Sequence, residues 1–521
     1  MDYTNLSFRE FLASKTDSNP DRVILVDDAQ PYTWSDIDRG SSAIASDLAR
    51  MGVSKRSRVG FAMTNGIGFV MGFFAVQKLG AIVLLINPSQ LAEDIGATAL
   101  VGDATHMIYG DLPGMKSDPD FAGKLITSAH LTPDKTLHCH FDDPRNFIAG
   151  CSVSEPFADV SVEADDVAVM IFTSGSTGKP KGVMHSAYNV LNAATLNSAD
   201  QTLNDSDRTC LILPLFHIFG LVAGLFANAV ADSTLYIPKN IHALTVMETI
   251  DRYKCTIFHS VPTMLLAIVN NPDFKPGRVS SVRCTIISGA AATQSQIELF
   301  KKMMPNNRFL SSYGLSEMAP VSISSYNADD DVVLHTVGHL VKGVDVRFID
   351  PATGDDRPEG IEGEIIVKST ILMTGYYKLS ADDQAIDENG WIHTGDLGYI
   401  RDDGNLVLSG RLKELIIRGG ENIMPVQVES AISEFDIIEN VRVYGVPSEY
   451  YGEEVAACIV LKTDIKYNED EFRSALSQKL AKFRMPTYIE VYESFPVLGT
   501  GKIDNVRLKE DLLGRLGLNK Q

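Results

Sequence analysis

The stretch VAVMIFTSGSTGKPKGVMHSAYN, from Val167 to Asn189, joins an apolar run to a loop rich in Thr, Ser, Gly and Lys. The six apolar residues Val167–Phe172 predict a buried strand. The loop Thr173–Gly182 brings backbone N–H groups, hydroxyls and two ammonium groups to one place, and such donors bind a polyphosphate. The small and aromatic residues after it suit a helix that opens there.

Two other interpretations of this loop fit less well. A Walker A loop would require Gly-Lys after the four residues that follow Gly175, and Pro180 stands at that place. A flexible Ser/Gly linker does not usually follow a strongly apolar strand or contain Lys-Pro-Lys-Gly. The sequence therefore favours a phosphate-binding loop of another kind.

Length and composition predict a soluble protein of two or more domains. The chain has 521 residues, too many for one ordinary core, with 45% hydrophobic and 22% charged residues. Its net charge of −21 argues against nucleic acid as a main partner. An anionic ligand would therefore need a local concentration of Lys, Arg and backbone donors.

The cysteines and the chain ends indicate a cytoplasmic protein. The N-terminal MDYTNLSFREF has no basic region followed by an apolar core, so no signal peptide is expected. The C-terminal Leu-Asn-Lys-Gln is no peroxisomal address. His138-Cys139-His140 lacks a second ligand pair at zinc spacing, so we expect a loop or strand edge there. No C-x-x-C pair occurs, and we expect reduced, mostly buried thiols at Cys139, Cys151, Cys210, Cys255, Cys284 and Cys458.

One segment is long and apolar enough to suggest a membrane span. Thr209–Ala231 carries no charge. It contains Pro214, His217 and Asn228, however, and a buried core segment is the better interpretation.

Short apolar runs alternate with helical patterns through most of the chain, which predicts layered α/β structure. A helix is expected over Ser35–Met51, and a strand, helix and strand over Val59–Met63, Phe69–Leu79 and Ala81–Ile86. Residues 111–166 show little periodicity. Later strands are expected at Leu211–Leu215, Ser233–Ile237, Thr256–Ser260 and Cys284–Ser288.

The pattern changes twice toward the C-terminus. Gly343–Leu408 contains strands punctuated by Gly and Asp, at Val344–Ile349, Gly363–Val367 and Asn405–Leu408, and predicts a small β-rich subdomain. Beyond Arg411, helices at Val426–Phe435 and Glu469–Phe483 and strands at Val441–Tyr444 and Ala456–Leu461 predict a compact α+β unit. We place the domain boundary at Lys413, giving domains 1–412 and 413–521.

Further motifs follow the phosphate loop in order: PLFHIFG (214–220), SGAA (288–291), SSYGLSE (311–317), WIHTGD (391–396), GRLKE (410–414), RGGENI (418–423) and PVLGTGKI (496–503). With the loop, this series closely resembles the adenylate-forming superfamily of acyl-CoA synthetases, luciferases and nonribosomal adenylation domains. The best local match is to the branch of 4-coumarate–CoA ligases and fatty acyl-CoA synthetases. The resemblance implies a large N-terminal domain and a small mobile C-terminal domain.

The resemblance implies that the N-terminal domain binds Mg-ATP. Tyr313 would stack on adenine, Asp396 would accept hydrogen bonds from the ribose hydroxyls, and Glu317 would give an oxygen ligand to Mg²⁺. The family usually has Thr at Ser316, Gly at Ser312 and Pro at Ala292. The implied ATP-contacting residues are Thr173, Ser174, Gly175, Ser176, Thr177, Gly178, Lys181, Gly289, Ala290, Ala291, Ser312, Tyr313, Gly314, Ser316, Asp396 and Arg411.

The resemblance also implies an acyl pocket and a CoA path. Nonribosomal adenylation domains place an Asp at the position of His217, so an amino acid substrate would lack its counter-charge here. Gly419 and Gly420 would line the pantetheine tunnel. The implied pocket residues are small or apolar apart from the histidine at the mouth, and they predict a hydrophobic acid with an aryl or medium-chain alkyl tail: His217, Phe219, Ala223, Ser312, Pro320 and Val321.

The implied reaction has two halves. A carboxylate first attacks ATP to give acyl-AMP and pyrophosphate, with Lys502 and Arg411 offsetting the negative charge. The C-terminal domain then swings about Lys413 and CoA displaces AMP. Lys502, Glu317, Arg411 and His217 are the implied catalytic residues.

Three alternatives stay open at this point. The acyl group could pass to the phosphopantetheine of a carrier protein, against which Gly419-Gly420 argues weakly. The chain could instead be a nucleotide-binding sensor, against which Glu317 and Lys502 argue, or a membrane protein. The oligomeric state is open, and a homodimer is one possibility.

Overall fold

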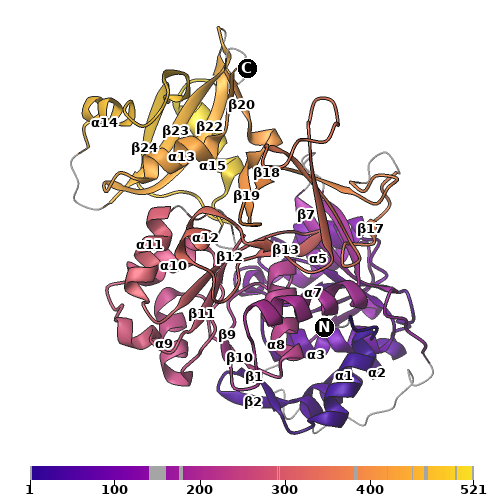
Figure 1. The fold of residues 1–521 in the computed structure, drawn as a ribbon. Helices are drawn as coiled ribbons and strands as arrows, with labels where there is room; N and C mark the ends of the chain where they lie inside the picture. The colour runs from indigo at the N-terminus through magenta and orange to yellow at the C-terminus, as the bar shows by residue number, and fades with distance from the viewer. Residues whose placement is uncertain are drawn as a thin grey trace.

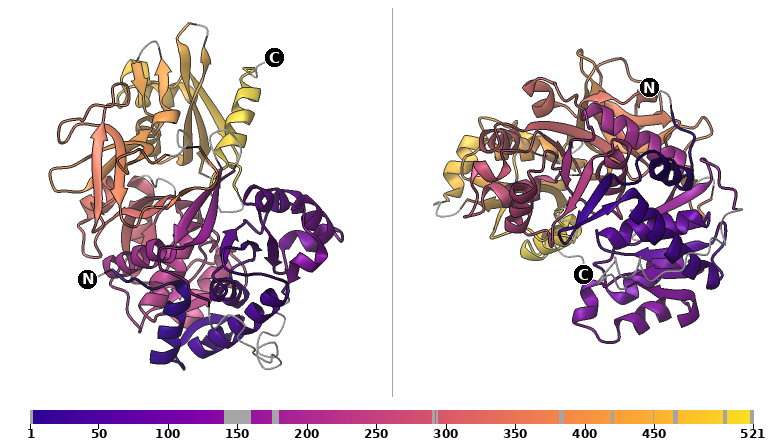
Figure 2. Two further views of the ribbon diagram at one scale, coloured as in Figure 1. Left: turned by 90° about the vertical axis from the view of Figure 1, so that its right-hand side faces the viewer. Right: turned by 90° about the horizontal axis from the view of Figure 1, so that it is seen from below.

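The structure, a computed structural model, describes residues 3–139, 160–174, 180–289, 292, 294–380, 385–418, 421–448, 450–462, 467–498 and 502–518. A large N-terminal body of α/β layers carries a small β-rich part, and the C-terminal domain stacks at one end of the molecule (Figure 1). The left view of Figure 2 shows the same stacking from the side. The expected fold class is confirmed.

A seven-stranded sheet carries the phosphate loop, and its strand order is β17-β8-β7-β4-β3-β5-β6. The strands β3 to β7 run parallel, as expected for buried α/β layers, and β8 returns antiparallel to β7. The bounds are β3 Arg58–Ala62, β4 Ile82–Leu85, β5 His106–Tyr109, β6 Thr136–His138, β7 Val167–Ser174, β8 Pro180–Ser186 and β17 Gly375–Tyr376.

A second sheet carries the strand ends of the remaining N-terminal motifs. Four strands lie in the order β2-β1-β10-β9, and four in the order β11-β12-β13-β14. Parallel bridges from Ile257 to Thr209 and to Cys284 place the segment 256–260 between β9 and β11. The bounds are β1 Val23–Asp27, β2 Gln30–Thr33, β9 Arg208–Cys210, β10 Thr234–Ile237, β11 Cys284–Ile287, β12 Arg308–Leu315, β13 Met318–Ile323 and β14 His339–Leu340.

Helices cover these sheets, and most begin at a recognisable cap. The hydroxyl of Ser186 accepts from the N–H of Asn189 and so starts α7, and Thr33 caps α2 in the same way. The helices of the N-terminal body are α1 Phe8–Ser18, α2 Trp34–Arg50, α3 Ile67–Lys78, α4 Ala92–Val101, α5 Phe121–Ser128, α7 Ala187–Asp200, α8 Ala227–Val230, α9 Ala243–Tyr253, α10 Pro262–Val269, α11 Gln294–Met303 and α12 Asp330–His335.

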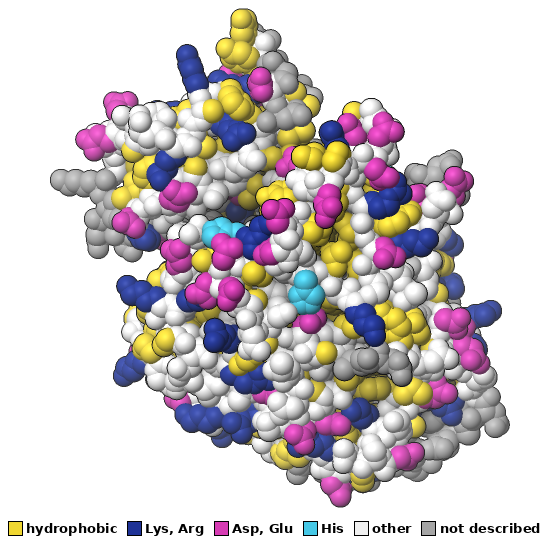
Figure 3. Space-filling model, in the orientation of Figure 1, with side chains coloured by type: hydrophobic (Ala, Val, Ile, Leu, Met, Phe, Trp, Pro, Cys, Tyr) yellow, Lys and Arg dark blue, Asp and Glu magenta, His cyan; other side chains and the backbone are white. Residues whose placement is uncertain are grey.

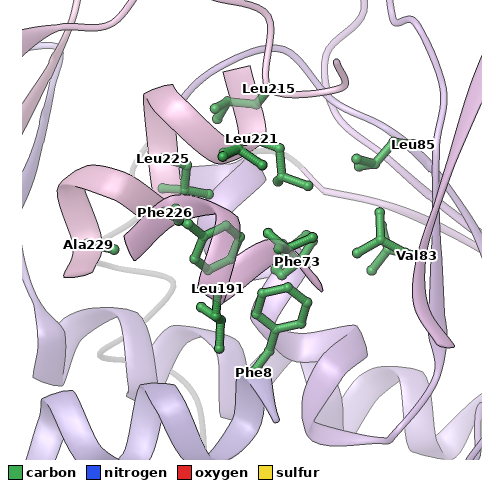
Figure 4. Packing of buried hydrophobic residues seen from close by; sticks show 14 of the residues in the cluster. Phe8, Phe73, Val83, Leu85, Leu191, Leu215, Leu221, Leu225, Phe226 and Ala229 are labelled. Atoms are coloured by element: carbon green, nitrogen blue, oxygen red, sulfur yellow. The ribbon is translucent and has the colours of Figure 1, made fainter. Parts of the chain in front are cut away.

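The largest hydrophobic cluster fixes the segment that follows β9. Phe8, Phe73 and Phe226 form an aromatic centre, with ring centroids 4.7 to 5.6 Å apart. Leu215 and Leu221 are buried in the same cluster (Figure 4). The residues between these two leucines, which include His217 and Phe219, are therefore held at both ends by core packing.

The β-rich part and the C-terminal domain form separate sheets. The first has the order β15-β16-β18-β19, and the second joins β20 to β24. The bounds are β15 Val344–Ile349, β16 Gly363–Ser369, β18 Ile392–Ile400, β19 Leu406–Arg411, β20 Ile416–Arg418, β21 Glu421–Ile423, β22 Ile438–Ser448, β23 Gly452–Leu461, β24 Tyr488–Tyr492, α13 Pro425–Ser433, α14 Glu469–Leu476 and α15 Asn505–Arg515.

Three local expectations were wrong. The helix expected directly after the phosphate loop begins only at Ala187, because β8 first pairs with β7 and β17. The strand expected at Leu211–Leu215 is not formed: β9 ends at Cys210, the Leu211 N–H still donates to the Tyr236 carbonyl, and residues 212–215 pack in the cores. The helix expected over Glu469–Phe483 ends at Leu476.

The expectation for Thr209–Ala231 was a buried core segment, and most of its residues are buried. Over the described part of the chain, no helix is both long and apolar enough to cross a bilayer.

On the face shown in Figure 3, acidic and basic side chains are interspersed and form no single basic patch.

Candidate active site

The phosphate loop joins two antiparallel strands. Thr173 pairs with Lys181 across the β7–β8 ladder, so the hairpin brings the lysine beside the strand end. The Lys181 ammonium lies 5.0 Å from the ring centroid of Tyr376, a cation–π distance. The side chain of Ser174 and the predicted residues Gly175, Ser176, Thr177 and Gly178 lie outside the described residues.

Tyr376 also contacts the predicted magnesium ligand. Its hydroxyl donates a hydrogen bond of 2.5 Å to Glu317 Oε1. Burial, followed by the nearby Glu317 carboxylate, raises the pKa of Tyr376, so the phenol stays protonated and keeps donating. Tyr376 thus connects Lys181 with Glu317. The sequence reasoning missed this residue, because a Gly-Tyr-Tyr run carries no chemistry by itself.

A buried histidine holds the loop that presents Glu317. His185 Nε2 lies 2.8 Å from the carbonyl oxygen of Ser316. Burial lowers the pKa of His185 to about 4, so the ring is neutral at pH 7 and this nitrogen donates to the carbonyl. His185 was also missed, since a single histidine after a strand is usually part of the core.

One magnesium ligand from the protein suits Mg-ATP. Among the described residues, no group of three or more His, Cys, Asp or Glu side chains could hold a metal. Mg²⁺ bound to a nucleotide needs only one or two carboxylates, because phosphate oxygens and water complete its shell. The Glu317 carboxylate therefore fits this ion, whose bound charge would offset that of the phosphates.

Tyr313, Asp396 and Arg411 form one hydrogen-bonded group. Asp396 is buried; its Oδ2 accepts from the Tyr313 hydroxyl at 2.6 Å, and its Oδ1 lies 2.6 Å from Arg411 Nε. Asp396 and Arg411 face each other across the β18–β19 ladder. A carboxylate held by two fixed donors is pre-organised to accept vicinal hydroxyls.

Lys502 reaches this region from the C-terminal domain. A methyl group at Gly289 would lie 3.0 Å from Lys502 Cε and 3.2 Å from Nζ, so the lysine packs directly against the glycine backbone. Gly289 has a φ of +81°, which also favours glycine. Burial, followed by the charge of Arg411, lowers the pKa of Lys502. Two residues separated by 213 positions thus meet between the domains.

His217 lies within the electrostatic reach of Lys502. Burial, then the charge of Lys502, lowers the pKa of His217 to about 4, so the ring is neutral at pH 7. Its Nε2 is buried and has no hydrogen-bond partner among the described residues. A buried polar atom without a partner is costly, and a bound ligand is one way to satisfy it.

Of the predicted pocket residues, Ala223 lies in a π-helical turn and Phe219 directly precedes that turn. The turn spans Gly220–Phe226 and follows Phe219 directly. A Cβ at Gly220 would lie 2.0 Å from the Pro214 carbonyl oxygen, so only glycine fits. The buried Asn228 amide donates to the carbonyls of Ala223 and Gly224, at 3.3 and 2.7 Å. Asn228 therefore links its side chain to the backbone of the wide turn.

Several other residues predicted for the pocket and the nucleotide come from the β12–β13 hairpin. Ser312 Oγ donates to the Ser322 carbonyl at 3.0 Å, and Ser288 Oγ donates to the Ser312 carbonyl at 3.0 Å. Pro320 and Val321 are buried on β13, and Val321 packs in the largest core cluster. Gly314 lies against Ala319, where a Cβ would approach to 3.0 Å.

The structure leaves some predicted positions untested. Ala290, Ala291, Gly419 and Gly420 lie outside the described residues. Lys413 lies in the short 3₁₀ turn Leu412–Glu414, between β19 of one sheet and β20 of the next. The hinge and the domain boundary at this residue stay predictions.

His138 lies on β6 and pairs with an acid. Its Nε2 lies 3.0 Å from Asp111 Oδ1, and its ring stacks on Tyr109. The five described cysteines are free and buried.

Comparison with known proteins gives this geometry a family. The model of the AMP-binding enzyme family matches residues 12–377, and that of its C-terminal domain matches residues 427–502. The chain is 30% identical to the Bacillus subtilis protein named "Putative acyl-CoA synthetase YngI", over 98% of this chain and 97% of that one. It is 28% identical to 4-coumarate:CoA ligase 1 of Petunia hybrida, over 93% and 89% of the two chains.

A solved structure agrees over the whole length. ATP-bound MatB from Rhodopseudomonas palustris superposes with a TM-score of 0.87 at 23% identity, covering 97% of this chain and 99% of that one. This match shows the fold. These matches agree with the β7–β8 hairpin, the group around Asp396 and the position of Lys502. The chain belongs to the AMP-binding enzyme family, in the acyl-CoA synthetase branch of the adenylate-forming superfamily.

Proposed function

We propose that this protein converts a hydrophobic carboxylic acid into its CoA thioester at the expense of ATP. In the first half-reaction a carboxylate oxygen attacks the α-phosphorus, and the bond to pyrophosphate breaks. In the second half-reaction the CoA sulfur attacks the acyl carbon, and AMP leaves with the bonding electrons. The observation that carries the proposal is the approach of Lys502 to Gly289, next to the Asp396 group.

Positive charge is the first requirement of the adenylation step, because it brings two anions together. We assign Lys502 and Arg411 to the α-phosphate and carboxylate oxygens and Lys181 to the outer phosphates. Glu317 would hold Mg²⁺. Tyr313 and Asp396 would hold the adenosine, so the phosphorus stays fixed while the acid approaches.

The acyl side is built from apolar and small residues. Phe219 and Ala223 at the π turn and Pro320 on β13 support a hydrophobic tail, with His217 at its carboxylate end. The relatives include a 4-coumarate:CoA ligase, which supports an aryl acid. The zebrafish medium-chain acyl-CoA ligase ACSF2, 27% identical, supports an alkyl acid. We therefore keep both classes as candidate substrates.

The two halves need different positions of the C-terminal domain. The contact of Lys502 with Gly289 supports assigning this position of the domain to the first half. We propose that a rotation about Lys413 then removes Lys502 and brings Gly419 and Gly420 to the pantetheine path. The relatives are acyl-CoA ligases, so transfer to a carrier protein is not favoured.

Two further assignments follow from the sequence. We propose a cytoplasmic location, supported by five buried, unpaired cysteines. A homodimer is proposed as one assembly to test by light scattering.

A panel of carboxylic acids tests the function. Pyrophosphate release is measured with each acid, ATP and Mg²⁺, with and without CoA, and thioester is measured directly. We expect acid-dependent release and thioester from aryl or medium-chain acids. No release with any acid would refute adenylation, and release without thioester would refute the CoA step.

A further inference from the structure

His259 is a buried histidine outside the predicted site, placed at the same sheet edge. It lies in the segment 256–260, which runs parallel between β9 and β11. The chain that follows β9 leads to His217 and Phe219, and β11 leads to Gly289. Since the carboxyl ends of parallel strands meet at one edge, His259 belongs to the edge that carries the acyl and nucleotide residues.

The ring of His259 replaces a backbone group in the ladder. The Phe258 N–H donates to the Cys284 carbonyl at 3.1 Å, and the Ser260 N–H donates to the Ile286 carbonyl at 3.0 Å. Between these bonds, the Ile286 N–H donates to His259 Nδ1 at 3.1 Å. A nitrogen that accepts carries no proton, so the neutral ring has its proton on Nε2.

The Nε2–H group has no partner in the described part of the chain, although the residue is only 2% exposed. Burial, then the charge of Arg283, lowers the pKa of His259 to about 3, so the ring is neutral at any ordinary pH. Natural proteins rarely leave such a donor unsatisfied, and each case calls for an explanation. The bond from Ile286 explains why Nδ1 is present, but it does not explain a buried Nε2–H group without a partner.

The ring of Phe219 identifies what His259 faces. The two ring centroids are 6.4 Å apart, and the planes are inclined by 30°. Phe219 opens the π turn that we assign to the acyl tail. His217, which also has an unpaired Nε2, belongs to the carboxylate end near Lys502. His259 has no such charged neighbour in the reaction scheme, so its donor is available to the tail.

We propose that His259 is a specificity-determining residue, whose Nε2–H donates a hydrogen bond to an acceptor oxygen carried on the otherwise apolar acyl tail. This inference rests on the proposed function and narrows its substrate class. Carbonyl, ether and methoxy oxygens are suitable acceptors. A trapped water is the competing partner, and it would need two to four polar neighbours.

Two substitutions separate the donor from the structural bond. In His259→Asn the amide oxygen can stand where Nδ1 stands and accept from Ile286, but no N–H remains at the Nε2 position. In His259→Gln the amide nitrogen can reach the Nε2 position, but the acceptor for Ile286 is lost. A role in the fold alone requires Nδ1, and the proposed role requires Nε2–H.

The experiment compares acids in matched pairs. Each alkyl acid is paired with acids in which one methylene is a carbonyl, at successive positions, and cinnamic acid is paired with its methoxy derivatives. The readout is the ratio of kcat/KM for pyrophosphate release within a pair. In the carbonyl pairs the two acids have nearly equal volume, so a change in pocket volume cancels. Thermal unfolding of each variant is measured in parallel.

We expect the wild-type protein to favour one acceptor-bearing acid about 10-fold or more over its parent, as one satisfied buried donor allows. His259→Asn should bring that ratio to about 1, and His259→Gln should retain most of it. The inference is overturned if no pair differs in the wild type, or if His259→Asn keeps the ratio. If the inference fails but plain acids still give pyrophosphate release, the proposed function stands. If no acid gives pyrophosphate release, the inference and the proposed function are both refuted.

Discussion

Replacing Lys502 with alanine tests the contact on which the adenylation step depends. The side chain packs against Gly289, at 3.0 Å from a Cβ placed there; its charge acts on His217, and the charge of Arg411 acts on it. The substitution removes one positive charge from this point. The contact with Gly289 that it removes lies between the domains.

The expected loss follows from electrostatics. Two unit charges about 4 Å apart interact by about 4 kcal/mol at an effective dielectric constant of about 20. Part of this attraction already acts on the bound ground-state anions and does not accelerate the reaction. We therefore expect pyrophosphate release to slow by about 100- to 1,000-fold, the range seen when one preorganised donor to a developing charge is lost.

The assay separates the two halves. Pyrophosphate release from acid and ATP measures the first, and thioester formation from preformed acyl-AMP and CoA measures the second. The second should change by no more than a few-fold. Lys482→Ala removes an exposed lysine from the same domain and serves as the matched control.

The pH profile gives a second readout. Because burial and Arg411 lower the pKa of Lys502, its charge is lost as pH rises through a value below 10.5. The alkaline limb of kcat/KM for ATP should therefore fall below pH 10.5 and be absent from the alanine variant. Equal loss of both half-reactions, or an unchanged alkaline limb, would refute the role given to this lysine.

Three further predictions concern neighbouring contacts. Gly289→Ala should slow pyrophosphate release about 10-fold or more and spare the thioester half, because the added methyl group displaces Lys502; equal slowing of both halves would contradict this. Asp396→Asn should raise KM for ATP about 10-fold, as expected for a buried acceptor that loses charge-assisted bonds; isothermal titration with ATP checks it, and unchanged affinity would contradict the ribose assignment. The pKa of His185 is lowered from 6.5 to about 4, so between pH 6.5 and about pH 4 the unfolded chain binds more protons than the folded one. The free energy of unfolding should therefore fall as pH drops through this range, by about 3 kcal/mol at most from this ring. Urea unfolding of the wild type and His185→Gln gives the free energy of unfolding at pH 7 and pH 5. An equal change between the two pH values in both proteins would exclude a contribution from His185.

The sequence was most informative where chemistry and periodicity agree. The strand Val167–Phe172 is continuous and apolar, and β7 extends it by only two residues. Asp396 and Arg411 were assigned to ATP from two separate motifs, and they face each other in one ladder. Such features are local or are fixed by motif order, and a sequence displays both.

Contacts made by distant parts of the chain were beyond the sequence. Tyr376 contacts Lys181 and Glu317 only because β17 pairs with β8, a pairing between segments almost 200 positions apart. His259 Nε2 is left without a partner at a point where the Ile286 N–H donates to the His259 ring instead of to a backbone carbonyl of the parallel ladder. The run Leu211–Leu215 is apolar for packing reasons alone, and apolarity without periodicity does not distinguish a strand from a buried loop.

Arg411 and Lys502 carry the same charge but belong to different bodies. Arg411 ends a strand of the N-terminal β-rich sheet, where Asp396 anchors it, whereas Lys502 lies beyond the link at residues 412–415. A rotation of the C-terminal domain would therefore move Lys502 away from the site and leave Arg411 in place. The acyl-AMP would therefore stay bound to Arg411 while the C-terminal domain rotates. Its release into solvent and its hydrolysis would be limited because Arg411 does not move with that domain.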